Sequence, residues 1–211
     1  MLPFKRIVVL APHPDDGEFG AGASLAKWIE QGAEVFYIAF SPCTASVPEG
    51  FEKDVLYKEL AQANEHLGIK AKNRICFNFD VRYFPENRQA ILEELIKLKK
   101  QIQPDLVLLP ATTDIHQDHQ VISQEGIRAF KHSCLLGYEL PWNNISITLN
   151  HHVAVEDQHL DKKIAAVNAY ESQGFRIYKD QQYIRSWAQF RGVQSGMPMA
   201  ESFELIRWFQ R

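Results

Sequence analysis

Ile7-Val8-Val9-Leu10-Ala11, followed at once by Pro12-His13-Pro14-Asp15-Asp16, is the stretch of this sequence that decides the fold. The first five residues are an unbroken apolar run rich in β-branched side chains, the pattern of a strand buried on both faces of a sheet. Such strands belong to parallel sheets that helices cover on both sides. The polar residues that follow would then lie at the carboxyl end of this strand.

Short apolar runs like the first recur along the chain, and stretches with helical spacing of apolar residues separate them. The further strands predicted in the first part of the chain are residues 35–40, 75–79 and 106–109. The helices predicted there are residues 21–31, 52–67, 87–103 and 121–130. Alternation of this kind is typical of βαβ units with right-handed crossovers. The sequence therefore predicts an α/β fold, a Rossmann-like, mostly parallel sheet with helices on both faces.

The pattern loosens beyond residue 133. Residues 134–140 and 146–155 resemble strands, residues 161–170 resemble a helix, and residues 200–208 fit either type of element. No internal repeat, low-complexity tract or linker marks a second domain, so we expect residues 1–211 to form a single domain.

Composition excludes several classes of protein. The net charge is −3, and no basic face or stripe suggests a nucleic-acid partner. Three cysteines at wide spacing, without a C-x-x-C pair, indicate free thiols. No apolar run approaches the length of ~20 residues that spans a membrane. We expect a soluble cytoplasmic protein, and a homo-oligomer is compatible with the sequence.

Two polar clusters each follow a predicted buried strand, where open α/β sheets bind their ligands. His13-Pro14-Asp15-Asp16 follows the first strand, and His116-Gln117-Asp118-His119 follows the strand at residues 106–109. Hydrolysis of an amide at neutral pH needs an activated water, and a catalytic zinc supplies it through three His, Asp or Glu ligands and one open position. His13, Asp16 and His119 form such a set. Asp15 is then the candidate general base.

Other interpretations of these residues remain open. An Asp-Asp pair after a strand is often a turn with a helix N-cap. Gly20 and Gly22 would cradle phosphates if the chain were a nucleotide-binding module, although a G-x-G-x-x-G fingerprint should follow the strand directly, without an acidic cluster between them. The third interpretation is that the chain is a pseudo-enzyme without hydrolase activity.

The motifs resemble those of the PIG-L/LmbE family of zinc-dependent sugar de-N-acetylases. The two clusters carry most of the resemblance, and weaker matches extend it over most of the chain. Those further segments are Gly20-Ala21-Gly22, Tyr170-Glu171-Ser172-Gln173, Arg191-Gly192 and Ala200-Glu201-Ser202-Phe203. The resemblance implies removal of an N-acetyl group from an amino sugar or sugar conjugate, with Zn²⁺ or another divalent metal as cofactor. It also implies metal ligation by His13, Asp16 and His119.

The resemblance adds roles for three further residues. His116 would stabilise the oxyanion or protonate the leaving amine, Asp118 would orient a metal-bound histidine, and Arg82 would bind the substrate. The chain departs from the commonest pattern at one position, where Gly17 replaces the Glu that usually follows H-P-D-D and Glu18 comes one residue later. We expect Glu18 to face the helix start or the rim of the substrate site.

Overall fold

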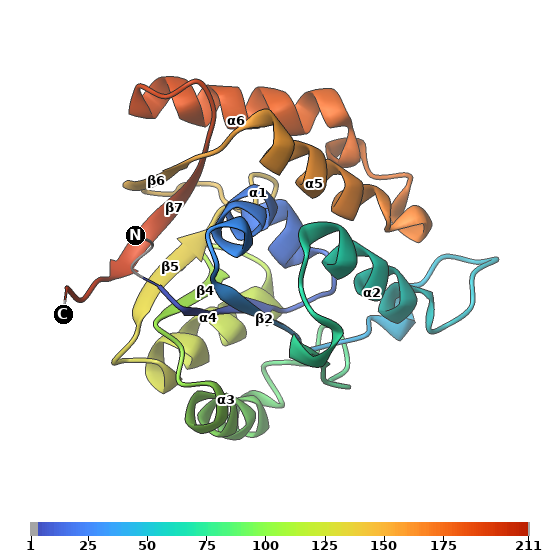
Figure 1. The fold of residues 1–211 in the computed structure, drawn as a ribbon. Coiled ribbons are helices and arrows are strands. Elements are labelled where there is room, and N and C mark those ends of the chain that lie inside the picture. The colour runs from blue at the N-terminus through green and yellow to red at the C-terminus, as the bar shows by residue number, and fades with distance from the viewer. Residues whose placement is uncertain (1–3, 211) are drawn as a thin grey trace.

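A seven-stranded sheet forms the centre of the computed structural model, which describes residues 4–210 (Figure 1). The spatial order of its strands is β3-β2-β1-β4-β5-β7-β6. Their bounds are β1 Arg6–Ala11, β2 Glu34–Ala39, β3 Arg74–Cys76, β4 Leu106–Pro110, β5 Cys134–Tyr138, β6 His151–Ala154 and β7 Ala200–Arg207. Strands β3, β2, β1, β4 and β5 pair in parallel, and only β7 runs antiparallel to both its neighbours. The prediction of a mostly parallel sheet is confirmed.

Strands β1 and β4 are direct neighbours, with Ile7 opposite Leu106 and Val9 opposite Leu108. The chain reaches β2 and β3 on one side of β1, and then crosses to β4 and β5 on the other. In open α/β sheets a ligand-binding crevice forms where the strand order reverses in this way, at the carboxyl ends of the strands. Both polar clusters of the sequence follow strands that border this point.

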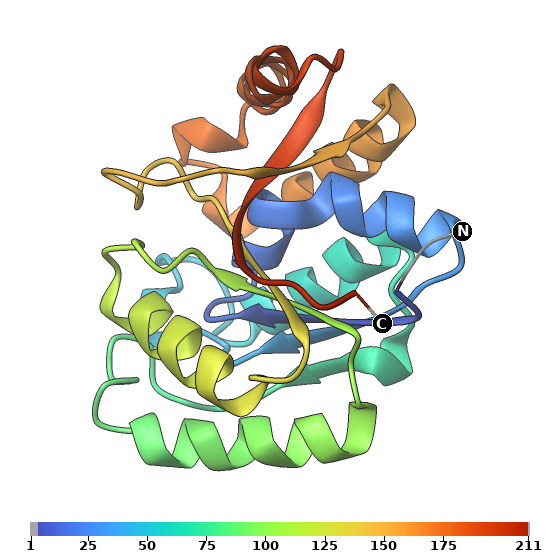
Figure 2. The same ribbon diagram turned by 90° about the vertical axis from the view of Figure 1, so that its left-hand side faces the viewer.

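Helices cover both faces of the sheet, as predicted (Figures 1 and 2). One layer contains α1 (Asp16–Glu30), α2 (Val55–Leu67), α5 (Asp157–Asn168) and α6 (Gln181–Ser195). The opposite layer contains α3 (Arg88–Ile102) and α4 (Gln117–Ala129). Each layer packs its apolar side chains against the alternate residues of the strands, for example Val9 on the first face and Val8 on the second. Within residues 4–210 no helix has the length and apolar character needed to cross a membrane.

The structure corrects several element boundaries. The strand predicted at residues 75–79 covers only Arg74–Cys76, the one predicted at 146–155 covers only His151–Ala154, and the segment at Ala200–Arg207 is a strand. The helix α6 was not predicted at all. Only Ile184, Ala188 and Gly192 of this helix are buried, so its sequence carries almost no apolar periodicity.

Helix α1 begins at Asp16, five residues before the predicted start. Glycines lower helix propensity, and the sequence there contains Gly17, Gly20 and Gly22. Tertiary packing overrides this preference, because a Cβ atom on Gly20 would lie 2.4 Å from the ring of Tyr138. The glycines are therefore packing positions inside a buried helix, which argues against the phosphate-cradling role considered above.

Candidate active site

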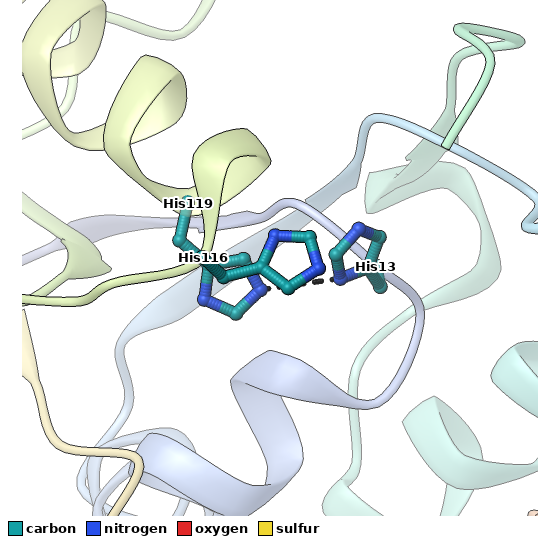
Figure 3. A group of neighbouring side chains, drawn as sticks. All are labelled: His13, His116 and His119. Carbon is teal, nitrogen blue, oxygen red and sulfur yellow. Dashed lines mark hydrogen bonds between the residues drawn. The ribbon is translucent and has the colours of Figure 1, made fainter. Parts of the chain in front are cut away.

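The two polar clusters meet at the carboxyl ends of β1 and β4. His13 Nδ1 lies 3.2 Å from Asp16 Oδ2, and His119 Nε2 lies 3.2 Å from the same oxygen. His13 Nδ1 and His119 Nε2 lie 3.2 Å from each other. Figure 3 shows His13 facing His119 and marks this contact with a dashed line. Three donor atoms from two distant parts of the chain thus form a nearly equilateral triangle.

A carboxylate lies behind each of these two histidines. His13 Nε2 is 3.0 Å from Asp118 Oδ2, and His119 Nδ1 is 2.8 Å from Asp114 Oδ2. Asp114 and Asp118 are buried, and a carboxylate accepts the N–H of the imidazole nitrogen that it contacts. When the two rings are neutral, this leaves a lone pair on His13 Nδ1 and on His119 Nε2, directed at each other and at an anionic oxygen. Such an arrangement calls for a cation between them.

The triangle has the dimensions of a metal site. Donors bound at about 2.0–2.1 Å to a tetrahedral zinc lie about 3.3 Å from one another. The carboxylates behind His13 and His119 are the partners that metal-bound histidines usually have. Donor types, spacing and hydrogen bonding of His13, Asp16 and His119 therefore fit a zinc ion or a similar divalent metal.

His116 lies beside the other two histidines, and possible ligand atoms of the three rings come within 4.8 Å of one another (Figure 3). Its Nδ1 accepts the backbone N–H of Asp118 at 3.2 Å, which caps helix α4. Burial and the neighbouring His119 and His13 lower the pKa of His116 to about 4, so the ring is neutral at pH 7. A neutral ring that accepts at Nδ1 carries its proton on Nε2. His116 is thus a hydrogen-bond donor, in contrast to the lone pairs of the other two rings.

The carboxylate of Asp15 has no capping role. Asp15 occupies the N-cap position of α1, but its side chain makes no cap hydrogen bond. It lines the same cavity as His13 and His116. Burial and the adjacent Asp16 raise the pKa of Asp15, which moves it toward the range of a general base. The simple N-cap interpretation of this residue is therefore wrong.

Arg82 reaches the site in a way that the sequence did not indicate. Its backbone N–H donates to Asp118 Oδ2 at 2.6 Å, and the N–H of Phe84 donates to the other oxygen at 3.3 Å. The φ angle of Arg82 is 74°, in the left-handed region. Its guanidinium lines the cavity and donates to Ser46 Oγ at 3.3 Å. The main chain of Arg82 thus helps to hold Asp118, while its side chain faces the cavity.

Glu18 does not lie at the rim. It is fully buried, accepts a hydrogen bond from Asn64 Nδ2 at 3.0 Å, and lies 3.1 Å from Tyr170 Oη, with a further short contact to Tyr37 Oη. Burial raises the pKa of Glu18 to about 8. Of the two positions expected for Glu18, the substrate rim is wrong, because side chains from β2, α2 and the segment after α5 enclose the carboxyl group within the first turn of α1.

The candidate metal site opens into a cavity of about 230 Å³. Trp142 and Tyr178 stack there with their ring centroids 3.8 Å apart, and Arg176 and Gln173 complete this wall. A larger hollow of about 790 Å³ near Arg6 contains none of the predicted site residues. The predicted residues that line the smaller cavity are His13, Asp15, Asp16, Arg82, His116 and His119.

Sequence reasoning missed Asp114, Arg176 and Tyr178. Asp114 could have been suspected, because it lies in the loop directly before the His116-x-x-His119 pair, within reach of either ring. Arg176 and Tyr178 belong to an irregular segment with a short 3₁₀ helix at Ile177–Lys179, where no periodic pattern marks a functional residue.

Donor atoms arranged in this way, beside a further carboxylate that lines the same cavity, are typical of hydrolases that use a bound metal ion. Comparison with known proteins defines the family. The model of the PIG-L family, described as GlcNAc-PI de-N-acetylase, matches residues 8–130, and the chain therefore belongs to this family. The predicted membership of a family of hydrolytic de-N-acetylases is confirmed.

Individual relatives agree in fold. The diacetylchitobiose deacetylase of Thermococcus kodakarensis is 24% identical over 231 residues, which cover 96% of this chain and 83% of that protein. The N,N'-diacetylchitobiose deacetylase structure from Pyrococcus horikoshii has a TM-score of 0.80 at 22% identity, over 96% of this chain and 84% of that one. The structure of the 4-carboxy-2-hydroxymuconate hydratase GalB of Pseudomonas putida has a TM-score of 0.77 at 20% identity, over 98% of this chain and 99% of that one. The fold alone thus accommodates more than one reaction.

Proposed function

We propose that this chain, as one domain over residues 1–211, removes the N-acetyl group from an amino sugar or sugar conjugate in a zinc-dependent hydrolysis. The observation that carries the proposal is the triangle of His13 Nδ1, His119 Nε2 and Asp16 Oδ2, each pair 3.2 Å apart, with the carboxylate of Asp15 lining the same cavity. Membership of the PIG-L family and the deacetylases among its relatives support the reaction type.

His13, Asp16 and His119 would hold the metal. When bound, a zinc ion lowers the pKa of a water molecule from about 15.7 to about 7 and polarises the carbonyl oxygen of the substrate. Asp118 and Asp114 keep the two imidazoles in the tautomers that direct lone pairs at the site. The protein thereby avoids a reorganisation of its ligands during the reaction.

Asp15 acts as the general base. Its raised pKa brings proton affinity closer to the working pH, and its side chain is not committed to the helix N-terminus. The carboxyl group takes a proton from the attacking water and can return it to the leaving nitrogen.

His116 stabilises the oxyanion. A neutral ring with its proton on Nε2 donates a hydrogen bond, whereas protonation of a leaving amine would need an imidazolium, which a pKa of about 4 disfavours at neutral pH. The donor role is therefore the better supported of the two roles considered for His116. One such donor is typically worth ~3 kcal/mol of barrier.

The sugar occupies the cavity of about 230 Å³. The guanidinium of Arg82 on one wall can donate to sugar hydroxyls or to an anionic substituent. Trp142 and Tyr178, whose rings stack on each other, line the same cavity. We also propose a cytoplasmic location, because Cys43, Cys76 and Cys134 are all unpaired.

A substrate screen with controlled metal content tests the proposal. The protein is stripped with a chelator, reloaded with zinc, and assayed for released primary amine and acetate on N-acetylglucosamine, its glycosides and N,N'-diacetylchitobiose. We expect release by the reloaded protein and none by the stripped protein. Absence of turnover on all substrates, with zinc bound, would favour a pseudo-enzyme. Hydration of 4-carboxy-2-hydroxymuconate without any amide hydrolysis would favour the chemistry of the hydratase neighbour.

A further inference from the structure

A buried pair of tyrosines holds the turn that carries His13 and Asp15. The carbonyl oxygen of Pro14, between these two residues, accepts the hydroxyl of Tyr37 at 2.7 Å and the hydroxyl of Tyr170 at 2.6 Å. Tyr37 comes from β2, and Tyr170 follows α5. Both are buried, with 0% and 1% exposure, so neither hydroxyl has water as an alternative partner.

Glu18 and the backbone of Gly17 fix the two phenols. Glu18 contacts both tyrosine hydroxyls, and the N–H of Gly17 donates to Tyr37 Oη at 3.1 Å. A Cβ atom at position 17 would lie 2.7 Å from both Cε2 and Oη of Tyr37. Glycine at this position therefore lets the ring of Tyr37 approach the turn. This explains physically why Gly17 stands here, with the glutamate one residue later.

The Pro14 carbonyl controls the direction in which Asp15 leaves the turn. The proline ring fixes the φ angle of Pro14 at about −65°, and the peptide bond between Pro14 and Asp15 is planar. The remaining soft dihedral of Pro14 is ψ, which turns the carbonyl oxygen and the Asp15 backbone together. Two hydrogen bonds to that oxygen, from side chains of two separate segments, fix ψ and with it the orientation of Asp15.

We propose that Tyr37 and Tyr170 are positioning residues for Asp15, acting through the shared Pro14 carbonyl. The inference rests on the proposed function, in which Asp15 is the general base. His13 has an anchor outside this turn, since its Nε2 meets Asp118 at 3.0 Å, and the carboxylate of Asp16 meets His119 Nε2 at 3.2 Å. Loss of the hydroxyls should therefore misplace Asp15 more than it disturbs metal binding.

The test compares Tyr37→Phe, Tyr170→Phe and the double variant with a matched control. Tyr138→Phe is that control, because Tyr138 is equally buried and donates to the Leu10 carbonyl at 3.0 Å, within β1 instead of the turn. For each zinc-loaded protein kcat, KM and melting temperature are measured. Zinc affinity of each metal-free protein is measured by competition with a chromophoric chelator.

We expect kcat to fall about 3- to 10-fold in each single variant and about 100-fold in the double variant, the size of effect that a displacement of about 1 Å produces. KM should stay unchanged, and zinc affinity should change by less than about 3-fold because His13 keeps its contact with Asp118 and Asp16 keeps its contact with His119. Tyr138→Phe should lose a similar amount of stability and keep its kcat. If the double variant does not fold, the kcat and zinc affinity of the two single variants test the proposal.

Two results would overturn the inference. The first is that the Tyr37→Phe and Tyr170→Phe proteins keep the kcat of an active wild-type protein. This result would leave the proposed function intact. The second is an equal loss of kcat in Tyr138→Phe, which would make the tyrosines merely structural. Absence of turnover in the zinc-loaded wild type would instead overturn the proposed function, and this inference with it.

Discussion

His13 Nδ1 and His119 Nε2 lie 3.2 Å apart, although one follows β1 and the other lies in the first turn of α4, after β4. The adjacency of β1 and β4 in the sheet brings them together. Each ring directs its other nitrogen at a buried carboxylate, so both facing nitrogens carry lone pairs when the two rings are neutral. A pair of lone pairs at this distance is stable only with a cation or a proton between them, and the predictions below depend on this relationship.

Asp15→Asn should lower kcat by about 10²- to 10⁴-fold, the range for loss of a general base. The amide keeps the size of the carboxyl group but has no comparable proton affinity. Metal content and melting temperature should match those of the wild type, because Asp15 makes no cap hydrogen bond. Steady-state assays beside metal analysis check this outcome, and a fully active Asp15→Asn protein would contradict the assigned base.

Asp114→Asn should weaken zinc binding by about 10- to 100-fold, as loss of a carboxylate behind a metal-bound histidine typically does. Asp114 contacts His119 Nδ1 at 2.8 Å and lies outside the triangle of donors. Chelator competition measures the affinity. Asp105→Asn, which alters a carboxylate bound to backbone N–H groups near the start of β1, is a control in which zinc affinity should not change.

Zinc affinity should rise with pH. Burial lowers the pKa of His119, but Asp16 and Asp114 outweigh it and raise the pKa to about 10 in the metal-free protein. At pH 7 a proton must therefore leave His119 when the metal binds, and affinity should increase about tenfold per pH unit from pH 6 to 9. Calorimetric titrations in buffers of different ionisation enthalpy should detect at least one released proton at pH 7. Binding without proton release would contradict this assignment of the donors.

The titration of His119 also affects the stability of the metal-free protein. The folded pKa of His119 lies above its ordinary value of 6.5, so its contribution is complete below pH 6.5 and disappears as pH rises toward 10. The raised pKa of Glu18 acts in the same direction between pH 4.5 and 8, because the folded state retains a proton that the unfolded state loses. The melting temperature of the metal-free protein should thus fall on alkaline titration. Replacing Glu18 with Gln should remove the contribution of Glu18 between pH 4.5 and 8, whereas the contribution of His119 above pH 6.5 should remain.

Arg82→Gly and Arg82→Ala separate the two roles of Arg82. Both remove the guanidinium from the cavity and should raise KM by about 10- to 100-fold, the value of a charge-assisted hydrogen bond. Both keep the N–H that donates to Asp118. Only glycine relieves the left-handed φ of 74°, which costs about 1–2 kcal/mol for other residues, so Arg82→Gly should melt at or above the temperature of Arg82→Ala. An unchanged KM in both variants would remove Arg82 from the substrate site.

Much of this site could be predicted from the sequence because its signals are local. Buried strands have continuous apolar runs, so the sequence predicts where β1 and β4 end and which polar residues follow them. The three predicted donors, the candidate base and the neighbouring His116 all line one cavity in the structure. The exposed helix α6 had no comparable signal, since it buries only three residues.

Sequence alone determined the succession of strands and helices, the residue types at the strand ends, and through them the family. Only the tertiary structure decided that β1 and β4 are adjacent, that Asp114 lies behind His119, and that Tyr37 and Tyr170 share the Pro14 carbonyl. The physical reason is the range of the interactions. Periodicity and propensity act over a few neighbouring residues, whereas hydrogen bonds between buried groups join atoms that the chain brings together only when the sheet has formed.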